Sequence, residues 1–431
     1  MSSRKFLFLQ GPATPFFKRL AVAIRQQGHQ TLRVNFCGGD QLFSDSSCNI
    51  AFKKPFAEWL QWLEDLHQQH HFTDVVLFGD TRPLHQQAIN FFKKQNVAIH
   101  VYEEGYLRPD WITLEQNGVN GNSNLLNQPI EFWHSYKDSK PTQTESIGKN
   151  FLIRAWHDIK YRLANSLCKP VYPHYQTHRP SNAIWEYLGW AIRIPKNNLW
   201  REHKDNWTIR RLLSSRSSYF IVPLQLNADS QIKIHSPFDD VQQFIEQVMS
   251  SFAQYAPKDS KLVIKNHPLD TGLARHERFV KQFAKSLGIH KRIIFLETGH
   301  LPSLLKHTKG TIVVNSTTAT SALGHGSPTI ALGAALFNLP NLAFQHGLDR
   351  FWAEGKPADK VLFSNFRSGL IDLTQINGDF YKKHGIELAV EGSLKKLNIK
   401  PILTINSEHE VIDNISTTEV IDIPVYRYKH A

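Results

Sequence analysis

Cysteine is scarce in this sequence. Among 431 residues only Cys37, Cys48 and Cys168 occur, too few and too scattered for a disulfide framework or a zinc site. We therefore expect a cytoplasmic protein that has no resident metal.

Long apolar runs are missing as well, and none reaches the length of a membrane span. The apolar stretch at 5–10 is short and has no cleavage site after it, so we interpret it as a β-strand and not as a signal peptide. The sequence also has no Walker A loop, GxGxxG fingerprint, HExxH motif or Asp-x-Asp pair at a strand end. The familiar glycine-loop and metal motifs therefore do not account for its function.

Positive charge is what the chain has in excess. Lys and Arg number 50 against 38 Asp and Glu, which gives a net charge of +12. This balance predicts an anionic partner, which is nucleic acid, nucleotide or anionic lipid. No zinc finger or RNA-binding signature is present, so nucleic acid is not the expected partner.

Short apolar strands alternate with amphipathic helices along the chain. A strand at 5–10 precedes a helix at 15–28, and the same order returns with a strand at 219–226 and a helix at 238–255. This pattern predicts an α/β fold with two Rossmann-like domains that face each other across a central cleft. The predicted units are an N-terminal domain (1–150), a connector (151–211), a C-terminal domain (212–400) and a polar tail (401–431).

The connector is both basic and rich in tryptophan. It has 11 Lys or Arg and 4 Asp or Glu, a net charge of +7 by subtraction. Interleaved basic and aromatic residues suit a lipid headgroup surface, whereas a helical connector would pack its aromatic residues on the N-terminal domain. Both interpretations stay open, and they concern five tryptophans: Trp156, Trp185, Trp190, Trp200 and Trp207.

Polar residues follow several predicted strands, where open α/β sheets bind their ligands. Glu103 and Glu104 come directly after one strand, where a carboxylate can act as a general base or can simply be solvated in a turn. Gly105 lets the backbone approach a ligand closely.

A second strand end carries Gln225 and Asp229, which lie four residues apart. Asp229 is a candidate nucleophile toward an anomeric carbon. The alternative is that Asp229 is a turn or capping residue.

A third strand end suits a phosphate. By strand alternation Lys265 and His267 share a face, so they can hold a phosphate together. His267 can then give a proton to a leaving phosphate oxygen, while Pro268 fixes the turn. The alternative is a surface lysine beside a structural histidine.

A fourth strand end, at Asn315, is followed by hydroxyl residues. Ser316 or Thr317 is a good N-cap, and the free N–H groups of the helix start bind anions. Capping alone would also explain these residues. Between the third and fourth strand ends, Glu297 is placed to accept ribose hydroxyls, unless it is a surface acid before a turn.

In order along the chain, "EEGYLRPDWITLE", "QLNAD", "KNHP" and "NSTTATSA" resemble the capsule polysaccharide biosynthesis proteins of Gram-negative bacteria. The chain is long enough for one transferase unit, so it resembles the KpsS type of the KpsC/KpsS family. The resemblance implies a GT-B-like fold. It also implies a retaining β-Kdo glycosyltransferase that moves Kdo from CMP-β-Kdo to (lyso)phosphatidylglycerol and so starts the Kdo linker of capsular polysaccharide.

The resemblance also implies a role for each candidate. The CMP phosphate would be bound by Lys265, His267, Pro268, Asn315, Ser316 and Thr317, and the ribose by Glu297. The catalytic set would be Asp229 as nucleophile with Gln225 beside it, Glu103 or Glu104 as base, and His267 as an aid to the leaving group.

The same resemblance implies that no cofactor or metal takes part. The implied partners are CMP-Kdo, an anionic lipid and a capsule biosynthesis or export complex, at the inner face of the cytoplasmic membrane and peripheral to it. Two alternatives remain: another CMP- or CDP-dependent transferase such as a CDP-glycerol glycerophosphotransferase, and a non-catalytic component of a capsule export complex.

Overall fold

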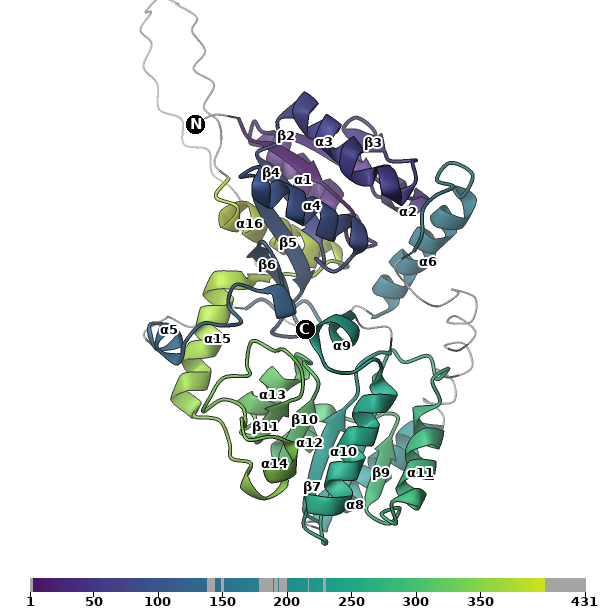
Figure 1. Cartoon of the computed structure of the whole chain (residues 1–431), viewed down its shortest axis with the longest axis vertical. Helices are drawn as coiled ribbons and strands as arrows, with labels where there is room; N and C mark the ends of the chain where they lie inside the picture. Colours follow the sequence, from purple (N-terminus) through teal and green to yellow (C-terminus); the bar gives the residue numbers. More distant parts are fainter. Residues whose placement is uncertain are drawn as a thin grey trace, which may run out of the picture.

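The structure of the protein is a computed structural model. It describes residues 3–137, 144–148, 151–177, 189, 193, 200–215, 217–227 and 230–399. These residues form two α/β lobes, each built around its own sheet (Figure 1).

The first lobe contains a seven-stranded sheet in the order β12-β6-β5-β4-β1-β2-β3. Strands β1 to β5 are parallel, and β6 and β12 add antiparallel strands at one edge. The strands are β1 (Lys5–Phe8), β2 (Gln30–Asn35), β3 (Asn49–Ala51), β4 (Asp74–Phe78), β5 (Ala98–Glu104), β6 (Trp111–Gln116) and β12 (Gln375–Asn377). The helices of this lobe are α1 (Phe16–Gln26), α2 (Gly38–Leu42), α3 (Trp59–His70), α4 (Pro83–Lys94) and α16 (Lys383–Lys396).

The second lobe contains a five-stranded parallel sheet in the order β11-β10-β7-β8-β9. The strands are β7 (Tyr219–Pro223), β8 (Lys261–Lys265), β9 (Ile293–Leu296), β10 (Gly310–Val313) and β11 (Thr329–Ala331). The helices are α8 (Glu202–Ser214), α9 (Ser230–His235), α10 (Val241–Tyr255), α11 (His276–Ser286), α12 (Leu301–His307), α13 (Thr318–Gly324) and α14 (Leu348–Glu354). Counted within each lobe, the five parallel strands follow the same order, 3-2-1-4-5, which matches the first five positions of the Rossmann order 3-2-1-4-5-6.

Strands buried on both faces explain why these segments read as continuous apolar runs. In β1, Phe6 packs into the core on one side of the sheet and Leu7 into the core on the other. In β7, Phe220 and Ile221 divide between two cores in the same way. Helices cover both faces of a parallel sheet, so its strands lose the polar alternation of a half-exposed sheet. The predicted α/β fold with two Rossmann-like lobes is therefore confirmed.

The end of the chain returns to the first lobe. Strand β12 pairs with β6, and α16 packs on α1, so Phe380 and Ile386 join the core around Phe16 (Figure 1). The prediction placed residues 212–400 in the second unit, but 375–397 belong to the first sheet and its core. The sequence pattern identifies a strand and a helix here, while the choice of sheet depends on which apolar surface is left uncovered.

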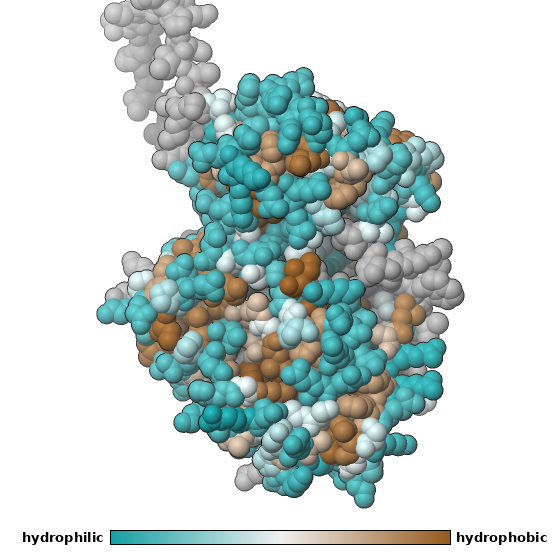
Figure 2. Space-filling model, viewed as in Figure 1, coloured by the Kyte–Doolittle hydropathy of each residue, from teal (hydrophilic) through white to brown (hydrophobic). Residues whose placement is uncertain are grey.

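Two further helices lie where the lobes meet, α5 (Ile130–His134) and α15 (Lys360–Thr374). The rings of Trp133 and Phe366 lie 4.7 Å apart, within a hydrophobic cluster that joins side chains of both lobes. The face drawn in Figure 2 is mostly polar, with hydrophobic residues in separate patches.

Helix α6 (Phe151–Leu167) begins the connector and lies beside the first lobe (Figure 1). Trp156, Trp200 and Trp207 of the connector are exposed, and Trp185 and Trp190 lie outside the described residues. No helix in the described ranges has both the length and the hydropathy needed to cross a membrane.

Candidate active site

Polar side chains meet at the carboxyl ends of β7 and β10, where the strand order of the second sheet reverses. Gln225 follows β7, and its Nε2 donates to Oδ1 of Asn315 (3.0 Å), which follows β10. Asn315 Nδ2 in turn donates to the backbone oxygen of Gln231 (2.8 Å). Ligands of α/β sheets bind at such a reversal, so these predicted residues mark a candidate site. Asp229, the predicted nucleophile, lies outside the described residues.

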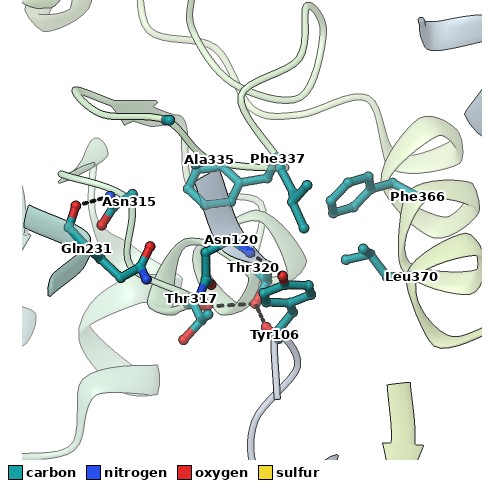
Figure 3. Close-up of a pocket in the computed structure, with 12 residues that line it drawn as sticks. Tyr106, Asn120, Gln231, Asn315, Thr317, Thr320, Ala335, Phe337, Phe366 and Leu370 are labelled. Atoms are coloured by element: carbon teal, nitrogen blue, oxygen red, sulfur yellow. Dashed lines mark hydrogen bonds between the residues drawn. The ribbon is translucent and has the colours of Figure 1, made fainter. Parts of the chain in front are cut away.

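A pocket opens beside this point, between the two lobes (Figure 3). Its cavity volume is about 30 Å³, within a wider space of about 380 Å³ that includes open solvent. Thr320 Oγ1 donates to the backbone oxygen of Tyr106 (3.2 Å), so the pocket wall is itself a contact between the lobes. Its polar lining comes from both lobes and consists of Tyr106, Asn120, Gln231, Asn315, Thr317 and Thr320.

His267 lies just beyond the end of β8 in a defined tautomer. Its Nδ1 accepts a hydrogen bond from the backbone N–H of Leu269 (3.1 Å), so the proton of the neutral ring is on Nε2. Burial and the positive charges of Arg108 and Lys265 lower the pKa of His267 to about 4. At neutral pH the ring is therefore uncharged, and its Nε2–H is suited to donate to an anion.

Lys265, the last residue of β8, is buried. Burial lowers its pKa, against the opposing effect of the negative charges of Asp205 and Glu297. The strand ends here, so the alternation argument does not extend to His267. Instead, Asn266 turns the chain by accepting the backbone N–H of His267 on its side-chain oxygen (2.8 Å).

Glu297 is already held by protein groups. Its Oε2 accepts hydrogen bonds from Asn266 Nδ2 (3.1 Å) and from the guanidinium of Arg193, which also pairs with Asp270 (2.8 Å). Asp205 of α8 accepts the backbone N–H groups of Glu297 and Thr298, each at 2.9 Å. Glu297 thus has a fixed position, and its predicted contact with ribose stays a prediction.

The start of α13 differs in detail from the prediction. Thr317 occupies the N-cap position, but its side chain makes no capping hydrogen bond. Ser316 Oγ instead accepts the N–H of Thr318 (3.2 Å). The backbone of Thr317 is helical, which turns its hydroxyl away from the position that an extended N-cap residue would reach.

Glu103 and Glu104 end β5 and lie in contrasting surroundings. Burial raises the pKa of Glu103 to about 7, although the N–H of Glu104 donates to its Oε1 (2.9 Å). Burial alone would raise the pKa of Glu104 too, but the charges of Arg154 and Arg108 keep it below its ordinary value. Neighbouring strand residues point to opposite faces of a sheet, which explains why two adjacent acids differ.

Glu104 is the centre of a contact between distant segments. Arg154 Nη1 of α6 lies 3.3 Å from Glu104 Oε1, and the hydroxyl of Tyr381 donates to the same oxygen at 2.6 Å. Arg108 and Arg154 also act on the pKa of His267. The charges of Arg108 and Arg154 therefore influence both Glu104 of the first lobe and His267 of the second lobe.

Gly105 lies at a close backbone contact within the first lobe. A Cβ atom at this position would lie 2.2 Å from the backbone oxygen of Trp111. This contact by itself requires a glycine, and the predicted approach of a ligand stays a prediction.

Sequence reasoning did not assign several residues of this region to the site. Arg108 could have been found, because it lies in the stretch "EEGYLRPDW" that contains the two acids. Arg154, Arg193 and Tyr381 come from remote segments, and no local pattern marks them as neighbours of the acids or of Glu297.

The fold and the site together define the class. Two Rossmann-like lobes face each other across a polar site at the carboxyl edges of their sheets, and the C-terminal segment crosses back to the first lobe. This is the GT-B architecture.

Comparison with known proteins then gives the family. Residues 73–381 match the sequence profile of the family described as "Capsule polysaccharide biosynthesis protein". The chain is 34% identical to the capsule polysaccharide export protein KpsS of Escherichia coli over 381 residues, which cover 88% of this chain and 98% of that protein. It is also 34% identical to the capsule polysaccharide modification protein LipB of Neisseria meningitidis serogroup B, over 89% of this chain and 93% of that protein. The chain belongs to the capsule polysaccharide biosynthesis family.

Among solved structures, the KpsC β-Kdo 2,7-transferase of Thermosulfurimonas dismutans aligns with 91% of this chain and 99% of its own, at a TM-score of 0.45 and 13% identity.

Proposed function

We propose that this protein is a retaining β-Kdo glycosyltransferase that uses CMP-β-Kdo and a (lyso)phosphatidylglycerol acceptor. The observation that carries the proposal is the pair of arginines, Arg108 and Arg154, that act on both Glu104 and His267. This shared influence supports the proposal that a carboxylate of one lobe and a phosphate-binding group of the other serve one site. The product would begin the Kdo linker of capsular polysaccharide.

In this proposal the second lobe binds the donor. His267 donates its Nε2–H to the CMP phosphate, and the buried charge of Lys265 compensates that of the phosphate. Asn315, Ser316 and Thr317 line the phosphate side, and Glu297 accepts ribose hydroxyls. No step is assigned to a metal ion, because cations of the chain neutralise the donor.

The transfer takes place by two displacements. The Asp229 carboxylate attacks the anomeric carbon of Kdo, the bond to the phosphate oxygen breaks, and CMP leaves as an anion whose phosphate accepts a hydrogen bond from the His267 Nε2–H. The acceptor hydroxyl then attacks the same carbon and loses its proton to Glu103 or Glu104, and Asp229 is released. Two inversions give net retention.

The acceptor side follows from the charge of the protein. The donor, a phosphatidylglycerol headgroup and a bacterial inner leaflet are all anionic, and the chain carries +12. The proposed location is therefore the inner face of the cytoplasmic membrane, with peripheral attachment.

Incubation of the purified protein with CMP-Kdo and with CDP-glycerol tests the donor. We expect release of CMP from CMP-Kdo when a short-chain lysophosphatidylglycerol is present, and no use of CDP-glycerol. Without acceptor, the intact mass should rise by one Kdo unit mapped to Asp229, and Asp229→Ala should abolish both the adduct and turnover. Consumption of CDP-glycerol alone would replace the proposal with a glycerophosphotransferase.

A second candidate is a non-catalytic part of a capsule export complex, which the name of the Escherichia coli relative, a capsule polysaccharide export protein, favours. Thermal unfolding with CMP separates the two. A bound ligand at a hundred times its Kd adds about 2.7 kcal/mol to stability, whereas a scaffold without a nucleotide site shows no shift.

A further inference from the structure

One face of α6 exposes a continuous row of large hydrophobic residues. The row, here called the α6 stripe, is spaced at four or three residues, and its members are 40 to 79% exposed. Single exposed hydrophobic residues are ordinary, but a row on one helix face marks a contact surface. The stripe consists of Leu152, Trp156, Ile159, Leu163 and Leu167.

The opposite face of α6 is committed to the first lobe. The buried Tyr161 donates its hydroxyl to Asp40 Oδ1 (2.9 Å), and Asn165 Oδ1 accepts the N–H of Gly39 (2.7 Å). A Cβ atom at Gly38 would lie 2.2 Å from a backbone oxygen of α6, so the helix packs directly against the backbone of α2. The helix cannot turn the stripe inward without losing these contacts.

A cation flanks the stripe on one side. At about 100° per residue, Lys160 lies beside the row, while Arg162 on the other side is paired with Asp158. The Lys160 ammonium lies 5.4 Å from the ring centroid of Trp156. The single acid of the helix, Asp158, is neutralised by Arg162 at 2.9 Å.

We propose that the α6 stripe docks this protein on an anionic lipid bilayer. A helix with an apolar face, a flanking lysine and a tryptophan lies in the interface with its axis along the membrane plane. A second copy of the chain is a poorer occupant, because each copy would bring the same cations and a net charge of +12.

The inference deepens the proposed function and rests on it for its purpose. The helix that carries the stripe also carries Arg154, which contacts Glu104 at 3.3 Å. Docking of α6 would therefore hold the catalytic acids at a fixed position next to the headgroup layer. Docking itself needs no donor and is measured without one.

Co-sedimentation with vesicles tests the proposal, using the full-length protein and phosphatidylcholine vesicles with and without phosphatidylglycerol. The combined variant Leu152→Ser, Trp156→Ser and Leu163→Ser should bind phosphatidylglycerol vesicles roughly a hundredfold more weakly than the wild type. A matched control replaces three exposed hydrophobic residues elsewhere, Leu60→Ser, Leu273→Ser and Val361→Ser, and should bind like the wild type. Circular dichroism and thermal unfolding check that both variants fold.

Three results would overturn the docking proposal: unchanged binding by the stripe variant, equal binding of the wild type to vesicles without phosphatidylglycerol, or a wild-type dimer that the stripe variant dissociates. Transfer to a short-chain soluble acceptor separates the two hypotheses. Stripe-dependent binding without any use of CMP-Kdo would reject the proposed function and keep the docking. Transfer to the soluble acceptor without stripe-dependent binding would reject the docking and keep the proposed function.

Discussion

At the scale of single residues, surroundings decide chemistry that residue type leaves open. Glu103 and Glu104 are the same residue type on one strand, yet burial raises the pKa of the first to about 7 and arginines keep the second ionised. A general base works best with a pKa near the working pH, whereas an acid with a depressed pKa is suited to orient cations.

The first prediction concerns Glu103→Gln. The folded-state pKa of Glu103 lies above its ordinary value of 4.5, so the folded protein keeps a proton that the unfolded chain releases. The stabilising effect of that proton is present below about pH 4.5 and is lost as the pH rises through 7. At pH 8 the variant should be more stable than the wild type by about 1–3 kcal/mol, and the difference should vanish near pH 4.

Urea unfolding at both pH values measures this difference, with Glu104→Gln as the control. Glu104 has a lowered pKa and favours its charged form, so Glu104→Gln should be less stable than the wild type at pH 8. Equal stability of Glu103→Gln and the wild type at pH 8 would mean that Glu103 ionises normally.

The second prediction concerns His267. Its ring is neutral above pH 5 because its pKa is lowered to about 4, so it should add no limb to the pH profile of kcat/KM above that pH. His267→Ala should reduce kcat/KM for CMP-Kdo by about 10²–10³-fold, because the leaving phosphate loses a hydrogen-bond donor. Steady-state kinetics from pH 5 to 9 test both statements, and wild-type kinetics in the variant would remove His267 from the site.

At the scale of elements, the connector helix α8 holds in place the turn that follows strand β9 of the second sheet. Asp205 is buried and its carboxylate accepts the N–H groups of Glu297 and Thr298 directly after β9. The turn that presents Glu297 is thus held from the side by a helix that precedes the second sheet in the chain.

The third prediction is that Asp205→Ala destabilises the protein by about 1–3 kcal/mol, because the backbone N–H groups of Glu297 and Thr298 lose their buried acceptor. It should also weaken CMP binding, since Glu297 loses its support. The matched control is Glu202→Ala, an exposed acid of the same helix, which should change stability by less than about 0.5 kcal/mol. Chemical unfolding and CMP titration give the two readouts, and equal stabilities of the two variants would contradict the assignment.

At the scale of the whole molecule, the C-terminal return joins parts that are remote in the chain. Phe380 packs on Phe16 with ring centroids 5.1 Å apart, and the next residue, Tyr381, donates to Glu104. The last described segment thereby completes the core of the first lobe and contacts Glu104, one of the two proposed bases.

The fourth prediction is that Phe380→Ala lowers the free energy of unfolding by about 3–5 kcal/mol, as expected for a large cavity in a closed core. Transfer activity should fall with it, because Tyr381 shifts away from Glu104. Val361→Ala, at an exposed site on α15, is the control and should stay within about 0.5 kcal/mol. A Phe380→Ala variant of wild-type stability would show that the return segment is not part of the cooperative unit.

Much of the fold was predictable because the signals are local. The apolar runs at 5–10, 219–226 and 292–297 each contain a strand of the structure, and the predicted helix at 238–255 contains α10. The predicted residues Gln225 and Asn315 also meet, since the carboxyl ends of neighbouring parallel strands lie at one edge. The return of β12 to the first sheet was not predictable, because the sequence of an edge strand does not specify which strand it pairs with.

The sequence by itself determined the α/β class, the strand ends that carry polar residues and the basic amphipathic character of α6, because each depends on residues near one another in the chain. Only the tertiary structure decided that Arg154 and Tyr381 contact Glu104, that Arg193 holds Glu297, and which face of α6 stays exposed. These contacts join segments up to 277 positions apart, as in Tyr381 and Glu104. Such pairs form only when packing of the hydrophobic cores brings their elements together, and no local sequence pattern specifies which elements will pack on one another.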